Sequence, residues 1–517
     1  MPTHAEAMAN ELAARGVQYV FGLPGGEIVA FIDACRRAGM RFLLTGHEAS
    51  AAWMAQVVGQ ITGVPGVCAT TLGPGATNLV TAVANAFLDR APMLAITAQI
   101  PASAIDTMTH QRLPLERLFS PITKASFAIE KNAADLIDRA MNLALEPRPG
   151  PVHVSLASDL ATTEDIIHDR TLAERSKRDD HLRPISKRLG AAKRPLVLIG
   201  LGATPSDASA IRALIGQLQA PFLVTPKVKG IVPEDHPLFA GVASGMAIDR
   251  DIVETIRAAD LILAIGFDPV ECDKTWFADV EVVSIDSVSM AEGRYQPLEA
   301  IGHIAQLVAS LSPDPKPWPS ELLEQRRKAI YREPGQGNSP LRLIQELRAI
   351  FPRDGIATCD VGSHKLLMGQ FWRAYEPGTF FMSNGLSGMG FGVPAAIAAQ
   401  LVHPKKAVLA VVGDGGMLMM LHDLALIREL ALPIIIVVLS DRSLSLIRVS
   451  EERRGIKPYG VDFTPPDFAK IAEAFGIPAR KAQSIQEARD AVERALTARS
   501  ALLIDVPIDY REYYDLV

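Results

Sequence analysis

The sequence has little cysteine and no long apolar run, and each shortage excludes a class of protein. Its four cysteines form no Cys-x-x-Cys pair: Cys35, Cys68, Cys272 and Cys359. This argues against a zinc site, a redox dithiol or a disulfide framework and fits a reducing compartment. Apolar runs such as 434–439 are far shorter than the roughly 20 residues of a membrane span, and the N-terminus lacks the apolar core of an export signal. We expect a cytoplasmic protein.

An excess of basic residues is also missing. Lys and Arg number 52 against 58 Asp and Glu, for a formal net charge of −6. No global positive field draws the chain to nucleic acid or to anionic lipid, so we expect neither partner. Aromatic residues make up only 6%, whereas apolar residues make up 48% of the 517 positions. A chain of this length and composition buries several cores and is expected to form two to four domains.

Short apolar runs alternate throughout with helical patterns of 10–15 residues, which is typical of parallel sheets built from strand-helix-strand units. The clearest predicted strands are 17–21, 41–45, 195–200, 260–266, 407–412 and 434–440. Each is followed by a Gly, Pro, Asp or Ser and then by a helix-like stretch. The fold class is therefore α/β.

Two segments interrupt this rhythm. Residues 162–183 are dense in charge, and 312–340 contain the proline-rich string SPDPKPWPS, which interrupts backbone hydrogen bonding. We interpret both as linkers. They divide the chain into domains at 1–165, 184–311 and 341–517, each predicted to be a doubly wound parallel sheet.

The C-terminal third carries the clearest chemistry. Its strand 407–412 ends in Gly413, Asp414, Gly415 and Gly416, with a helical pattern directly after. Glycines at such a turn let the backbone approach a ligand, and the free N–H groups of the helix start favour a phosphate. A carboxylate beside a phosphate position calls for a cation between the two.

A second aspartate is expected at the same sheet edge. Asp441 directly follows the strand 434–440 and lies 27 residues after Asp414, which is about one strand-helix-strand crossover, so the two carboxylates come out at neighbouring strand ends. They can share one Mg²⁺, with the carbonyl of Ser443 as a further ligand. A tight glycine turn and a helix N-cap are the alternative interpretation, and the spacing alone leaves it open.

Other stretches match one family in order along the whole chain. They are FGLPGG at 21–26, TGHE at 45–48, GPGATN at 73–78, RP at 194–195, DHP at 235–237, SNG at 383–385, MGFG at 389–392 and GDG at 413–415. Together they resemble the thiamine-diphosphate enzymes of the pyruvate decarboxylase and acetolactate synthase family. The resemblance implies a pyrimidine-binding N-terminal domain, a central domain like a dinucleotide fold and a diphosphate-binding C-terminal domain.

The resemblance also implies roles for single residues. Glu48 matches the catalytic glutamate that exchanges a proton with N1′ of the cofactor's pyrimidine, although a glutamate opening a helix is more often a partner of the helix dipole. Met389 matches the apolar prop that bends the cofactor, and Ser387 stands where the family often has Gly. The remaining cofactor-binding candidates are Gly25, Gly26, Gly362, Ser363 and His364.

Because the glutamate and the diphosphate motif belong to different domains, the resemblance implies sites assembled between two chains of a homodimer or a larger homo-oligomer. The Gly200–Ala203 turn of the central domain has a Gly-x-Gly pattern, which is weak support for a nucleotide. Some relatives hold FAD there and others leave it empty. We expect thiamine diphosphate and Mg²⁺ here, without FAD.

The stretch HQ at 110–111, followed by LFSPITK at 118–124, resembles the FAD-independent, catabolic type of acetolactate synthase. In that setting Gln111 would line the pocket of a 2-oxo acid. The run after Asp441 matches no member of the family, and its charges are typical of a solvated helix face, although Arg448 turned inward would suit an acidic substrate.

These patterns predict decarboxylation of a 2-oxo acid followed by ligation to a second carbonyl compound, with two pyruvates giving 2-acetolactate and CO₂ as the first choice. A simple 2-oxo acid decarboxylase that releases an aldehyde is the alternative. A noncatalytic homologue that only binds the cofactor is a second alternative, and the joint presence of Glu48, Asp414 and Asp441 speaks against it.

Overall fold

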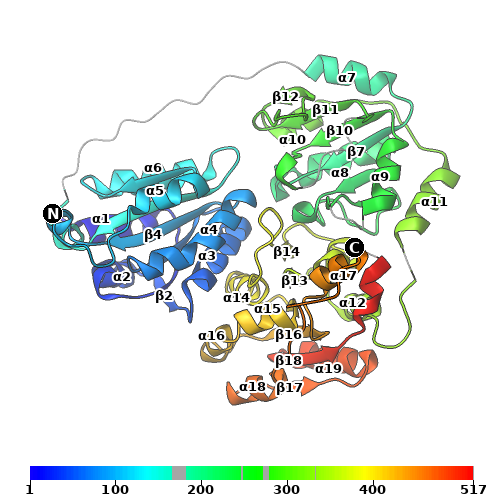
Figure 1. Ribbon diagram of the computed structural model, residues 1–517. Helices are drawn as coiled ribbons and strands as arrows, with labels where there is room; N and C mark the ends of the chain where they lie inside the picture. Colours follow the sequence, from blue (N-terminus) through cyan, green and yellow to red (C-terminus); the bar gives the residue numbers. More distant parts are fainter. Residues whose placement is uncertain (166–181, 246–248, 272–278, 332, 516–517) are drawn as a thin grey trace. The chain divides into compact units, whose positions relative to one another are not determined.

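The computed structural model describes residues 1–165, 182–245, 249–271, 279–331 and 333–515. The described residues contain three six-stranded sheets, and all their paired strands run parallel. Figure 1 draws these sheets in blue to cyan, in green and in yellow to red along the chain. The expectation of three doubly wound α/β domains is confirmed. Most of the predicted linker 162–183, and Cys272, lie outside the described residues.

The first sheet has the order β2-β1-β3-β4-β6-β5. Its strands are Tyr19–Leu23 (β1), Arg41–Leu44 (β2), Gly66–Thr70 (β3), Met93–Gln99 (β4), Ala125–Ala128 (β5) and Pro151–Ala157 (β6). The helices are His4–Ala14 (α1), Val29–Arg37 (α2), Glu48–Thr62 (α3), Pro74–Leu88 (α4), Leu115–Phe119 (α5) and Ala133–Leu145 (α6). Apolar side chains of α1, α2 and α6 form one core with the strands, whereas α3 packs against α4.

The second sheet has the order β12-β11-β10-β7-β8-β9. Its strands are Pro195–Ile199 (β7), Phe222–Val224 (β8), Phe239–Val242 (β9), Leu261–Ile265 (β10), Val282–Asp286 (β11) and Leu298–Ile301 (β12). The helices are Leu182–Ala191 (α7), Ala208–Leu218 (α8), Arg250–Arg257 (α9), Ile304–Ala309 (α10) and Ser320–Ile330 (α11). Two separate apolar cores, one with α7, α8 and α10 and the other with α9, show that both faces of the sheet are covered.

The proline-rich segment expected as a linker is attached to this second sheet. Its Trp318 is buried, and the indole N–H donates to the carbonyl of Pro195 at 2.8 Å. Helix α11 follows directly. A proline-rich string therefore runs along the central domain here, because its single tryptophan finds both an apolar pocket and a hydrogen-bond acceptor.

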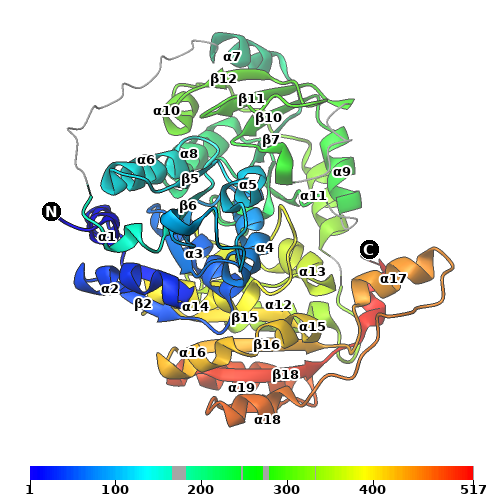
Figure 2. The same cartoon turned by 60° about the vertical axis from the view of Figure 1, so that its left-hand side comes forward.

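The third sheet has the order β14-β13-β15-β16-β18-β17, and Figure 2 shows β15, β16 and β18 side by side. Its strands are Ile356–Cys359 (β13), Phe380–Met382 (β14), Val408–Gly413 (β15), Ile434–Ser440 (β16), Ala479–Lys481 (β17) and Leu502–Pro507 (β18). The helices are Pro340–Ile350 (α12), Ser363–Phe371 (α13), Gly392–Val402 (α14), Asp414–Met419 (α15), Asp423–Glu429 (α16), Ser445–Arg453 (α17), Phe468–Ala474 (α18) and Ile485–Ala498 (α19).

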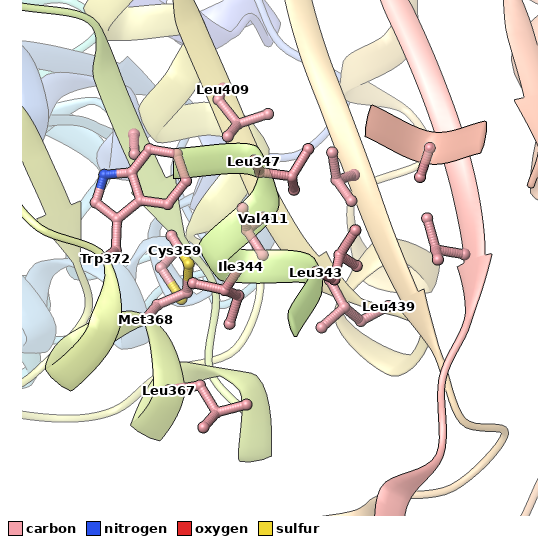
Figure 3. Packing of buried hydrophobic residues seen from close by; sticks show 14 of the residues in the cluster. Leu343, Ile344, Leu347, Cys359, Leu367, Met368, Trp372, Leu409, Val411 and Leu439 are labelled. Atoms are coloured by element: carbon pink, nitrogen blue, oxygen red, sulfur yellow. The ribbon is translucent and has the colours of Figure 1, made fainter. Parts of the chain in front are cut away.

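The core of this third sheet positions the glycine turn predicted to bind phosphate. Leu409 and Val411 of β15 pack with Trp372, Ile344 and Leu347 (Figure 3), and all five side chains are buried. A strand that is apolar on both faces is fixed in its register. The turn after β15 is therefore presented at a defined place.

By packing, the chain forms two units. One holds the described residues of Met1–Arg175 together with Gly385–Lys405 and Met419–Leu432, and the other holds the rest. Helices α14 and α16 thus pack with the first sheet's unit, α14 lying against α3. No helix of the described residues is long and apolar enough to cross a membrane.

Candidate active site

The metal motif lies in the second unit, where the two aspartates come together as their spacing predicts. Strands β15 and β16 pair in parallel, with Gly413 opposite Leu439. The Asp414 carboxylate accepts the backbone N–H of Gly415 at 2.8 Å and that of Arg442 at 2.7 Å. Adjacent strand ends therefore join Asp414 to the turn that carries Asp441.

The surroundings of both carboxyl groups disfavour their ionised forms. Burial, together with the nearby charge of Asp441, raises the pKa of Asp414 to about 6. Burial also raises the pKa of Asp441, against hydrogen bonds from Ser445 and Ser443 that lower it. A divalent cation between the two groups would relieve their repulsion. The described residues hold no cluster of three or more His, Cys, Asp or Glu that could bind a metal, so such an ion would need backbone and ligand oxygens as well.

Ser443, the proposed donor of a carbonyl ligand, follows Asp441 in a tight turn. It is buried, and its hydroxyl donates to the carbonyl of Val461 at 3.3 Å. The preceding Arg442 has a φ of 64°, an unusual backbone conformation for a residue other than glycine. Backbone strain of this kind often marks a functional loop.

The start of α13 contributes two buried polar atoms that have no hydrogen-bond partner among the described residues. They are Oγ of Ser363 and Nε2 of His364. The His364 ring lies between two glycines, because a Cβ built on Gly362 would come within 2.9 Å of it and one built on Gly413 within 3.1 Å. Burial lowers the pKa of His364 to about 4, so its imidazole is neutral. A hydroxyl without a partner at a helix N-terminus can donate to an anion.

Glu48 lies in the first unit, at the first position of α3. His47 caps the helix by accepting the Ala49 N–H at 3.0 Å on Nδ1. The Glu48 carboxylate is buried and accepts a hydrogen bond from Nδ2 of Asn78 at 2.9 Å. Asn78 belongs to the GPGATN stretch that the sequence singled out without a role. Its amide engages one oxygen of the Glu48 carboxylate, Oε2, and leaves the other oxygen, Oε1, available.

The loop that carries Ser387 and Met389 lies against the same helix. A Cβ on Gly388 would come within 3.1 Å of the Trp53 ring, and the Trp53 ring meets that of Phe391 edge to face at 5.5 Å between centroids. The structure therefore brings the Met389 loop to α3, the helix that Glu48 begins. Ser387 has a φ of 57°, in the left-handed region where the family often has Gly.

Gly25 and Gln111 belong to this unit as well. A Cβ on Gly25 would lie 2.5 Å from atoms of Thr71, so only glycine fits there, whereas Gly26 has open space around it. Gln111 has a φ of 57° and packs against Gly73, at the start of the turn that leads to Asn78.

Arg448 of α17 has partners already. Its guanidinium donates to Asp462 at 2.6 Å and to Glu452 at 3.3 Å, and it lies over the Tyr510 ring. Gly415 and Gly416 are the second and third residues of α15, directly after Asp414. Sequence reasoning missed Asn78 as the partner of Glu48, although it lies in a motif already noted.

Three models of known domains match the chain. They are the N-terminal TPP binding domain of thiamine pyrophosphate enzymes over residues 2–117, the central domain over 182–311 and the C-terminal TPP binding domain over 360–506. TPP is thiamine pyrophosphate, the same compound as thiamine diphosphate.

Full-length relatives match too. The chain is 31% identical to an acetolactate synthase of Bacillus subtilis, covering 99% of this chain and 94% of the relative. It is 31% identical to a probable acetolactate synthase large subunit of Methanocaldococcus jannaschii, covering 99% and 93%. A catabolic acetolactate synthase of Raoultella terrigena is 29% identical, with coverage of 98% and 95%.

Proposed function

The chain belongs to the thiamine pyrophosphate enzymes of the acetolactate synthase type, and from this premise we propose that it decarboxylates a 2-oxo acid and ligates the remaining acyl carbon to a second carbonyl compound. Two pyruvates giving 2-acetolactate and CO₂ is the reaction we favour. The observation that carries the proposal is the pairing of Asp414 and Asp441 at adjacent strand ends, beside the orphaned polar atoms of α13.

The residues present fit thiamine diphosphate and Mg²⁺. Asp414, Asp441 and the Ser443 carbonyl would hold the ion, whose charge would favour the ionised form of both buried carboxyl groups. Ser363 and His364, with the glycines at positions 362, 413, 415 and 416, would hold the diphosphate. When bound, the cofactor supplies the nucleophilic carbon and accepts the electron pair left by CO₂.

In the first unit, Glu48 would hold and exchange a proton at N1′ of the pyrimidine. The Asn78 amide fixes the carboxyl group for this task. Met389 would support the cofactor from the loop that packs on Trp53. Gly25, Gly26 and Ser387 would let the backbone approach it, and Gln111 would face the 2-oxo acid. For Arg448 the ion pairs with Asp462 and Glu452 favour a structural role over a substrate contact.

We propose domain boundaries at 1–165, 184–311 and 341–517, and a homo-oligomer in which Glu48 and the metal motif of one site come from different chains. A cytoplasmic location is supported by three cysteines that are free and buried, Cys35, Cys68 and Cys359. The formal net charge of −6 favours neither nucleic acid nor membrane as a partner.

FAD does not fit the central domain well. Of the four N–H groups in its Gly200–Ala203 turn, that of Leu201 donates to the Glu271 carboxyl at 2.7 Å, and those of Gly200, Gly202 and Ala203 donate to backbone carbonyls at 2.9, 2.7 and 2.9 Å. A dinucleotide diphosphate would need these donors. A carboxyl group of the chain itself takes the place of a phosphate, which supports the expectation of an enzyme without FAD.

The test is to incubate the purified protein with thiamine diphosphate, Mg²⁺ and a panel of 2-oxo acids. Release of CO₂ from pyruvate, with acetoin appearing after acidification, supports acetolactate formation. A free aldehyde supports the alternative decarboxylase. No CO₂ from any acid overturns both and leaves a noncatalytic homologue.

A further inference from the structure

Three polar side chains meet beside the start of α3, the turn of helix that Glu48 begins. None of them belongs to the proposed catalytic or cofactor-binding residues. Oγ of Ser50, on α3, lies 3.0 Å from Nε2 of His422 and donates to Oδ2 of Asp423 at 3.0 Å. Ser50 and Asp423 are buried, whereas the His422 side chain is 31% exposed. The three groups form a chain from a solvent-exposed imidazole through a hydroxyl to a buried carboxyl group.

The geometry excludes a nucleophilic serine of the protease type. In such a triad the carboxylate orients the far nitrogen of the histidine ring. Here Asp423 faces the same nitrogen as Ser50, Nε2, at 3.6 Å, and the serine hydroxyl donates to the aspartate. The arrangement is a proton-conducting one, because Ser50 can accept from one neighbour while it donates to the other.

Asp423 has the environment of a carboxyl group that holds a proton. Its Oδ1 is buried and has no hydrogen-bond partner among the described residues. A buried acceptor without a donor is costly when charged. Burial raises the pKa of Asp423 to about 7, and burial together with the nearby His47 lowers that of His422. The proton affinities of His422 and Asp423, the two ends of this series of hydrogen-bonded groups, are thereby brought closer together.

The three hydrogen-bonded side chains lie next to the two residues that precede Glu48 in the sequence. A Cβ on Gly46 would come within 2.7 Å of the His422 side chain, and the rings of His47 and His422 are 6.0 Å apart. Ser50 lies two residues beyond Glu48, whose own carboxylate is held by Asn78. Helix α14, which also packs on α16, has no ionisable side chain between Gly392 and Val402. His47 and Glu48 are therefore the ionisable groups next to these three hydrogen-bonded side chains.

We propose that Ser50, His422 and Asp423 form the proton relay that supplies the α3 turn from solvent during turnover. The inference rests on the proposed function, because decarboxylation takes up a proton: two 2-oxo acid anions become one anion and CO₂. A site that excludes water needs a path for that proton. Asp423 acts as the reservoir and His422 as the exchange point.

The step balances as an internal acid–base exchange. Nε2 of the His422 imidazolium passes its proton to Ser50 while Ser50 passes its own hydroxyl proton to Oδ2 of Asp423, so that an imidazolium and a carboxylate become a neutral imidazole and a carboxylic acid. His422 is then recharged by water, and the reverse shift returns the proton from Asp423 to His422. No bond other than O–H and N–H changes.

The first test uses the protein without cofactor. In a sample labelled at histidine carbons, the NMR titration of His422, assigned from the His422→Gln variant, is expected to show two coupled steps in the wild type. Asp423→Asn should reduce this to a single step with a midpoint lower by about one pH unit or more, because the attraction of the carboxylate is lost. Identical titrations of His422 in both proteins would overturn the relay.

The second test uses the enzyme loaded with thiamine diphosphate and Mg²⁺. Asp423→Asn and Ser50→Ala should each lower kcat about tenfold and flatten its pH profile, with KM for pyruvate unchanged. Turnover of His422→Ala should recover when imidazole is added, whereas that of Asp423→Asn should not. Glu429→Gln, an exposed acid on the same helix, is the matched control and should behave as the wild type.

The two tests separate the possible failures. A wild type that releases no CO₂ from any 2-oxo acid refutes the proposed function, and the titration still decides whether the three residues share a proton. A coupled titration together with unchanged kinetics of Asp423→Asn would overturn the role in proton supply.

Discussion

Glu48 depends on one side-chain contact for its orientation, the hydrogen bond from Asn78. Replacing Glu48 by Gln keeps the shape of the side chain and removes its exchangeable acid proton. We expect turnover to fall at least about 100-fold while thiamine diphosphate still binds, measured by product formation and by calorimetric titration of the cofactor. The exposed Glu130→Gln is the control, and near-normal activity of Glu48→Gln would refute the catalytic role.

The metal pair allows a graded prediction. Asp441→Asn retains an oxygen ligand and loses the charge, whereas Asp441→Ala loses both. We expect the Mg²⁺ concentration for half-maximal activity to rise about tenfold in the first variant and about 100-fold in the second. The exposed Asp354→Asn should leave it unchanged. Equal Mg²⁺ dependence in all three variants would show that the ion, if needed, binds elsewhere.

The buried carboxyl group of Glu271 is expected to make the stability of the folded protein depend on pH. Burial raises its pKa from 4.5 to about 8, so the folded protein binds this proton more tightly than the unfolded chain does. The stabilisation is complete below about pH 4.5 and is lost as the pH rises to about 8, by up to about 5 kcal/mol. In thermal unfolding between pH 5 and 8, Glu271→Gln should remove most of the fall in Tm across this range. An unchanged slope would contradict the raised pKa.

At the level of elements, strands were more predictable than helices. The run 434–440 is the strand β16 to the residue, because a continuous apolar segment between turn residues has few alternatives. The apolar pattern 417–430 indicated one helix, yet α15 ends at Met419 and α16 begins at Asp423. Between them His422 lies against Gly46, a contact between residues far apart in sequence that periodicity does not contain.

The loop before Met389 is held by a buried acid at the end of α4. Asp89 accepts the backbone N–H of Gly385 at 2.7 Å and the side-chain amides of Asn85 and Gln56 at 3.0 and 3.2 Å. Asp89→Ala would leave these donors unpaired, at about 1–3 kcal/mol each. We expect a lower Tm and a weaker affinity for thiamine diphosphate, by about tenfold.

Asp33→Ala, on the exposed face of α2, is the matched control for this anchor. Its Tm and cofactor affinity should stay near those of the wild type. If Asp89→Ala lowers only Tm and leaves the cofactor affinity unchanged, Asp89 stabilises the helices without positioning the loop.

For the whole molecule, the sequence predicted the three sheets and which motif belongs to each. The placement of Asp414 and Asp441 at neighbouring strand ends followed from their spacing together with the strands before them, since parallel strands return to the same edge. The contacts around Glu48 did not, because Asn78, Ser50 and Asp423 are ordinary polar residues in the sequence. Folding buries Ser50 and Asp423 and leaves Oδ1 of Asp423 without a hydrogen-bond partner among the described residues. Local patterns carry topology, whereas buried polar networks depend on the tertiary packing of several elements.

The proposed sharing of each active site between two chains can be tested by combining two inactive variants. Glu48→Gln and Asp414→Asn should each be inactive alone. When the two inactive proteins are co-expressed with different tags and the mixed oligomer is purified, one site of each mixed dimer receives an intact Glu48 and an intact Asp414, and the other receives both substitutions. Mixed dimers should then show about half the wild-type turnover per chain pair. Sites built within single chains would leave every mixed dimer inactive, so absence of restored activity would refute the shared site while leaving the roles of both residues intact.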